Sequence, residues 1–166
     1  RLKTYPVHAE IGSKFITHIA PIRDGKLWLG NATDLWEFNP AAGEYLEAGM
    51  LLKELGDMEA AASTLQQVPA SSERFLEASA ALGQIFVETE MYSLAKEKLQ
   101  KVVATVPPTA DSLEIYYLMA LAHEKGGEPQ SALPLYEKVM ASRLNYRDVP
   151  ARIAALKERR ASAPTQ

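Results

Sequence analysis

From about residue 42 onwards the sequence repeats itself at a nearly fixed interval. The repeat is anchored by three alanines, Ala61, Ala95 and Ala132, which lie 34 and 37 residues apart. Aligning them brings further sets of similar residues together: Leu65, Leu99 and Tyr136; Val68, Val102 and Val139; Gly49, Gly83 and Ala120; and Gly56, Glu90 and Gly127. Such intervals are typical of chains that stack copies of one small unit. Because a single unit cannot bury its apolar faces alone, the period predicts a stacked-repeat architecture.

Within each repeat the residue pattern predicts a pair of helices. Prolines become rarer after residue 41, while Ala, Leu, Glu and Lys dominate and apolar residues recur at helical spacing. The aligned small residues let two helices approach closely, and the larger ones fill the space between successive pairs. After the last repeat, Asp148 is suited to begin a helix, and Val149, Ile153 and Leu156 share one face of it. We therefore expect a helical-repeat domain at 41–160, with repeats at about 42–75, 76–112 and 113–146 and a capping helix at 148–160, followed by a disordered tail at 161–166.

This pattern resembles the tetratricopeptide repeat (TPR), a unit of about 34 residues that forms two antiparallel helices. In that family a small residue stands at the eighth position, as Gly49, Gly83 and Ala120 do here, and the three anchoring alanines match the twentieth position. Pro107 matches the closing proline in the middle repeat. The resemblance covers about residues 42–146. It implies a mainly α fold, a TPR-like α-solenoid of the kind found in bacterial adaptor and scaffold proteins.

The N-terminal segment at 1–40 differs from the repeats. It holds three of the ten prolines and short runs of strand-forming residues, with Asp24-Gly25 as a hairpin signal. These runs predict a small β-rich segment of two or three strands at 15–19, 26–29 and 35–38. So few strands are marginally stable in water, so we expect the segment to rest on the first repeat as a cap. Its tryptophans, Trp28 and Trp36, are candidates for docking onto another protein.

The resemblance also implies a concave groove lined by the first helix of each repeat, where such proteins take up peptides or helices. Too few Lys, Arg and Asn stand at these positions for clamping a C-terminal carboxylate, and the apolar ones suggest a channel for an apolar segment. An external partner, the chain's own N-terminal strands or a neighbouring copy are the alternative occupants. The predicted groove residues are Leu46, Met50, Lys53, Ala80, Gln84, Val87, Tyr117, Leu121 and Glu124.

Charge is unevenly distributed along the repeats. Residues 44–112 contain 11 acidic and 5 basic residues, whereas residues 143–160 contain 6 basic and 2 acidic ones. The basic residues of 143–160 allow a docking surface for an acidic partner, but a solvated helix face is the favoured interpretation. With a net charge of −3, the whole chain is not expected to bind nucleic acid.

Neither catalysis nor a bound cofactor is expected. The chain has no cysteine, and its histidines, His8, His18 and His123, do not show the spacing of a metal site. There is no nucleophile motif or phosphate-binding glycine loop. No apolar run approaches the roughly 18 residues of a membrane span, so an integral membrane protein is not expected.

The sequence thus favours a non-catalytic protein–protein interaction module, a scaffold or adaptor that binds a partner segment in the groove of the repeats. The alternative is a structural accessory subunit of a larger complex, a membrane-associated one included, docked through the N-terminal segment.

Overall fold

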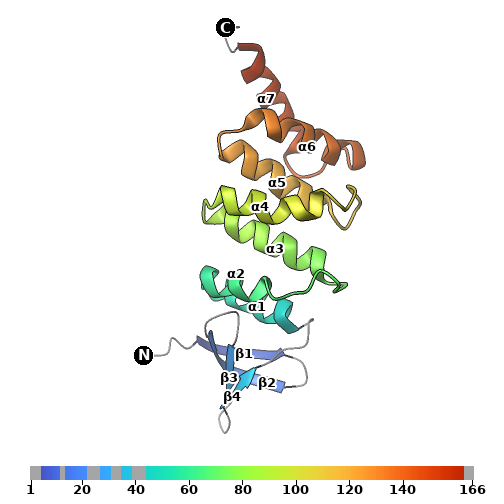
Figure 1. The fold of residues 1–166 in the computed structure, drawn as a ribbon. Helices are drawn as coiled ribbons and strands as arrows, with labels where there is room; N and C mark the ends of the chain where they lie inside the picture. Colours follow the sequence, from blue (N-terminus) through green and yellow to red (C-terminus); the bar gives the residue numbers. More distant parts are fainter. Residues whose placement is uncertain (1–4, 12–13, 22–26, 31–34, 39–43, 163–166) are drawn as a thin grey trace. The chain divides into compact units, whose positions relative to one another are not determined.

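The computed structural model describes residues 5–11, 14–21, 27–30, 35–38 and 44–162 of the chain. Four strands come first, and seven helices follow them among these residues (Figure 1). The chain divides into two compact parts, an N-terminal half at Arg1–Ile85 and a C-terminal half at Phe86–Gln166.

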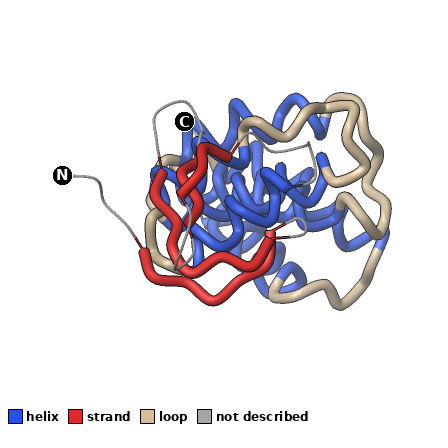
Figure 2. The backbone as a smooth tube through the Cα atoms, turned by 90° about the horizontal axis from the view of Figure 1, so that it is seen from below, coloured by secondary structure: helices blue, strands red, loops and turns tan. Residues whose placement is uncertain are grey.

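The strands, drawn in red in Figure 2, form one antiparallel sheet, and they follow each other in it in the order of the chain. In its centre Ile19 pairs with Leu29, and both side chains are fully buried. The strands are β1 (Tyr5–Ile11), β2 (Lys14–Pro21), β3 (Leu27–Gly30) and β4 (Leu35–Phe38).

The expectation of two or three strands was wrong, because it missed β1. This strand contains Pro6, which lowers the strand signal of its sequence. A proline is tolerated at the edge of a sheet, where one side of the strand makes no ladder hydrogen bonds. In the observed order β1 is such an edge strand, and its register shifts between Pro6 and Ala9. The predicted Asp24-Gly25 turn lies outside the described residues.

The described helical region consists of seven helices in sequence. In the N-terminal half α1 packs against α2, and in the C-terminal half α5 packs against α4 and α6, and α6 against α7. The last helix exposes most of its polar residues and buries Val149, Ile153 and Leu156. The predicted tail falls partly within α7, and its remainder at 163–166 lies outside the described residues. The helices are α1 (Glu44–Glu54), α2 (Met58–Leu65), α3 (Phe75–Glu88), α4 (Tyr92–Val103), α5 (Leu113–Lys125), α6 (Pro129–Ser142) and α7 (Val149–Ser162).

The aligned positions of the repeats are the packing positions of the structure. Ala61, Ala95 and Ala132 are fully buried, and so are the larger residues four positions later in each repeat. In the first pair, a Cβ atom added to Gly49 would lie only 2.6 Å from Cγ of Leu65. Glycine at this position therefore sets how closely α1 can approach α2.

The turns between paired helices share one backbone conformation. Gly56, Glu90 and Gly127 all have positive φ angles, of 80°, 60° and 83°. The backbone N–H of the residue that follows each of them donates to the carbonyl oxygen five residues earlier. At the second turn, for example, Met91 donates to Phe86 at 2.7 Å. This is the Schellman ending of a helix, which favours glycine at the left-handed position. Glu90 adopts that conformation without being a glycine.

Replacing Glu90 by glycine is therefore expected to stabilise the chain. A non-glycine residue in the left-handed region carries a penalty of about 1 kcal/mol, and Glu90→Gly removes it. Urea unfolding should show the free energy of unfolding rising by about 0.5–1 kcal/mol. The control is Gln100→Gly in the exposed interior of α4, which should lower it by a similar amount. A decrease for Glu90→Gly would contradict the strain at this turn.

The contact between Gly49 and Leu65 predicts a non-additive pair of substitutions. Gly49→Ala places a methyl group against Leu65, and such overpacking destabilises by about 1–3 kcal/mol, partly offset by the better helix propensity of alanine. Leu65→Ala leaves a cavity and lowers the free energy of unfolding by about 2–5 kcal/mol. In the double variant the new methyl group has room, so the loss should be smaller than the sum of the single losses. An additive double-mutant cycle would show that the two residues are not in contact.

Candidate partner-binding surface

The nine predicted groove residues lie on α1, α3 and α5, the first helices of the repeats, and they divide into two classes. Four of them are packed into the protein, with only 1–8% of their surface exposed. The other five keep accessible surface. The packed ones are Leu46, Val87, Tyr117 and Leu121; the accessible ones are Met50, Lys53, Ala80, Gln84 and Glu124. The apolar channel that the sequence suggested is therefore largely used up in helix packing.

The two candidate docking tryptophans lie in neighbouring strands. Trp28 in β3 is half-buried and pairs with Glu37, while Trp36 in β4 pairs with Leu29. The register does not pair the tryptophans with each other. The side chain of Trp36 lies outside what the structure describes.

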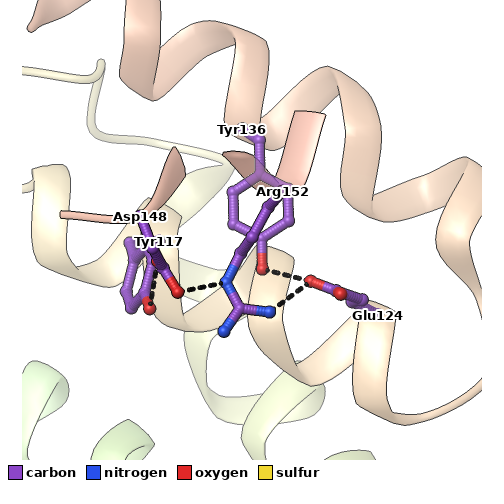
Figure 3. Close-up of polar contacts among 5 residues, drawn as sticks. All are labelled: Tyr117, Glu124, Tyr136, Asp148 and Arg152. Carbon is purple, nitrogen blue, oxygen red and sulfur yellow. Dashed lines mark hydrogen bonds and ion pairs between the residues drawn. The ribbon is translucent and has the colours of Figure 1, made fainter. Parts of the chain in front are cut away.

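A polar network joins α5, α6 and α7 within the C-terminal half (Figure 3). The hydroxyl of Tyr117 donates to Asp148 at 2.9 Å, and Nε of Arg152 donates to the other oxygen of that carboxylate at 2.8 Å. A second nitrogen of Arg152 donates to Glu124 at 2.9 Å, and the hydroxyl of Tyr136 donates to the same Glu124 oxygen at 2.8 Å. Because each of these groups has a partner of suitable chemistry, the network fixes the start of α7 against α5.

Beside this network, Arg147 sits in a cage of two tyrosine rings and one carboxylate. Its guanidinium carbon lies 5.0 Å from the centre of the Tyr117 ring and 5.8 Å from that of Tyr146. A guanidinium nitrogen lies 2.8 Å from Oε2 of Glu114, which also accepts the hydroxyl of Tyr146 at 2.6 Å. The rings of Tyr117 and Tyr146 meet edge to face, with their centres 6.0 Å apart. We call Glu114, Tyr117 and Tyr146 the arginine cage.

Burial and carboxylate partners change the acidity of the tyrosines around the cage. Burial, followed by the hydrogen bond to Glu114, raises the pKa of Tyr146 from 10.0 to about 12. Burial and the bond to Asp148 raise the pKa of Tyr117, and burial and the bond to Glu124 raise the pKa of Tyr136. All three hydroxyls therefore stay protonated as donors at neutral pH.

The basic residues at 143–160 serve partly as internal partners. Arg147 pairs with Glu114, Arg152 with Glu124 and Asp148, and Lys157 with Glu137. The other three, Arg143, Arg159 and Arg160, are exposed. The acidic side of α5 and the first half of the basic run thus neutralise each other.

Sequence reasoning did not identify the arginine cage or the network. Tyr117 and Glu124 were predicted as groove residues, but their partners stand about 30 positions further along the chain. The only local signal was the pair Asp148 and Arg152, whose i, i+4 spacing predicts an ion pair on one helix face.

His123, the histidine of the helical region, is paired with a glutamate. Nδ1 of His123 lies 2.6 Å from Glu128, whose other oxygen accepts from Lys96 at 2.6 Å. These two bonds lower the pKa of Glu128, the bond from Lys96 having the larger effect. Within the described ranges no three His, Asp or Glu side chains gather as metal ligands, and none of the helices is long and apolar enough to span a membrane.

The raised pKa of Tyr146 predicts a distinct step in an alkaline titration. A group whose pKa is higher in the folded chain stabilises it fully below the ordinary pKa, and that contribution disappears as pH rises through the folded value. The free energy of unfolding should therefore fall more steeply between pH 10 and 12 in the parent chain than in Tyr146→Phe. Tyrosinate absorbance should show a phenol ionising near pH 12 that Tyr146→Phe lacks and that Glu114→Gln moves part of the way down. An unchanged titration in Tyr146→Phe would contradict the assignment.

Comparisons with known proteins agree with this geometry. Residues 45–71, which contain α1 and α2, match the tetratricopeptide repeat family model. None of the curated proteins matches the chain. Among solved structures, the MamA RS-1 ArsTM double mutant is 20% identical with a TM-score of 0.64, over 75% of this chain and 68% of that one.

Two further structures give the same result. MamA from Desulfovibrio magneticus RS-1 is 21% identical with a TM-score of 0.62, over 73% of this chain and 67% of that one. A thermophilic TPR protein in Thermus thermophilus is 17% identical with a TM-score of 0.57, over 73% and 66%. At such identities the likeness shows the fold, which confirms the expected fold class. The chain therefore has a TPR-like fold, mainly α-helical, with a small N-terminal sheet.

Proposed function

We propose that the chain is a non-catalytic protein-interaction module that binds a segment of a partner protein on the first helices of its repeats, α1, α3 and α5. The fold supports the coarser part of this statement, because TPR structures serve generally as scaffolds for other proteins. The finer part, the surface that receives the partner, rests on the side chains of those helices.

One observation carries the proposal. The predicted positions on each first helix include packed side chains, such as Leu46 on α1 and Leu121 on α5, and the same helices carry accessible ones, such as Met50, Lys53 and Glu124. A surface of this kind holds its accessible groups in place, so that binding a partner costs little ordering of the module itself. The accessible set is mixed in character, so the partner segment is expected to bring polar groups as well as apolar ones.

The proposal is tested with paired charge-reversal variants used as bait in affinity capture. Lys53→Glu combined with Gln84→Glu changes two first helices. Lys101→Glu combined with Gln67→Glu changes the charge equally at exposed positions outside the first helices. A specific partner should be retained at least tenfold less by the first variant than by the parent chain, and equally well by the second. Mass spectrometry identifies the partner, and calorimetry with the purified partner should give one site with the same ranking.

Equal retention by both variants would contradict binding on the first helices. Trp28→Ala, in the sheet, is the third bait. A partner lost only with Trp28→Ala would instead favour the accessory-subunit role, with docking through the N-terminal segment.

A further inference from the structure

We propose that the arginine cage, Glu114, Tyr117 and Tyr146, is a binding site for an arginine side chain of the partner segment, and that Arg147 is its internal occupant. This inference rests on the proposed function, because it names the chemistry of the group that the first helix of the third repeat would recognise.

The cage has the parts that an arginine side chain requires. Two aromatic rings lie 5.0 and 5.8 Å from the guanidinium carbon that now occupies it, within the range of favourable cation–π contact. One carboxylate, Glu114, forms an ion pair with that guanidinium, with a nitrogen–oxygen distance of 2.8 Å. A flat, charged group with several donors suits two rings and a carboxylate better than a compact ammonium does. The site therefore favours arginine over lysine.

The cage is held in place by contacts that do not involve Arg147. The hydroxyl of Tyr146 donates to Glu114, and the hydroxyl of Tyr117 donates to Asp148. The Tyr117 ring is also 6.1 Å from the ring of the fully buried Tyr136. Removing the Arg147 side chain thus leaves both rings and the carboxylate with their own supports.

Arg147 itself is placed so that it can leave. Its side chain is 52% exposed, whereas that of Glu114 is 25% exposed. It lies in the short connection between α6 and α7, with a φ angle of 45°, a backbone conformation that disfavours a residue with a Cβ atom. An arginine brought by a partner must displace Arg147 from the cage. The parent chain can bind that arginine only while the cage is empty, and its apparent affinity for the arginine is lowered accordingly.

The charges around the cage fit a basic guest. Asp148 and Glu124 already share Arg152, which keeps a cation beside the cage, and Glu114 is the carboxylate left for the guest once Arg147 has moved. The guest then replaces one cation by another, so the local charge balance is conserved. An acidic or neutral guest would leave Glu114 without a cation.

The test uses the full chain and one defined small molecule. N-acetyl-arginine methylamide is titrated into the isotope-labelled protein, and the amide signals of α5 and of residues 143–149 are followed by nuclear magnetic resonance. Arg147→Ala and Arg147→Gly both empty the cage. Alanine adds no backbone strain beyond that of the native arginine, and glycine relieves the strain of the positive φ angle, so the glycine variant is the second test if the alanine variant is unstable. The matched control is Arg143→Ala, which removes an exposed arginine of the same connection. The neutral citrulline analogue replaces the arginine probe in a parallel titration.

The expected result is binding at least tenfold tighter to Arg147→Gly than to the parent chain or Arg143→Ala. Adding Glu114→Gln to Arg147→Gly should weaken binding of the arginine probe at least fivefold, and the citrulline analogue should not bind. Equal affinity of parent chain and Arg147→Gly, equal binding of citrulline, or failure of both Arg147 variants to fold would overturn the cage proposal. Partner capture that depends on Lys53 and Gln84 tests the proposed function, whereas the titrations with the arginine probe test the cage. One proposal can therefore fail while the other holds.

Discussion

The close approach of two paired helices is the constraint on which the rest of this structure depends. Gly49 lies directly against Leu65, and the alanine that follows the turn of each repeat is fully buried. Only small side chains allow helix axes to come so near, and the larger residue four positions on then fills the space that remains. The three Schellman turns, with positive φ at Gly56, Glu90 and Gly127, bring the second helix back at the required angle.

The same close packing decides which side chains are left for recognition. Val87, Tyr117 and Leu121 stand at positions that the TPR resemblance assigns to a groove, yet the protein buries them. What remains accessible is Met50, the small Ala80 and three polar side chains. In the C-terminal half, Glu114 and Glu124 of α5 form ion pairs with Arg147, which precedes α7, and with Arg152, which lies in it. The arginine seated between two tyrosines is the most exposed member of these ion pairs.

Much of the fold could be predicted from the sequence, because helix pairs depend on neighbours within one repeat. The aligned alanines and their larger partners are buried, and so are Val149, Ile153 and Leu156, which share one face of α7. The missed strand, β1, shows the limit of local signals. Its Pro6 is unfavourable inside a sheet and acceptable at an edge, and only the strand order reveals which of the two applies.

The sequence by itself determined the period, the paired helices and the residues that pack between them. Apolar residues spaced three and four positions apart share one face of a helix, so the order of small and large side chains already shows which residues are buried. Tertiary structure alone decided that Tyr117 meets Asp148 and that Glu114 meets Tyr146 and Arg147. These partners lie 31 to 33 residues apart. Their distance in space depends on how successive helices pack and on the backbone angle at Arg147, and neither quantity is fixed by the residues near any one of them.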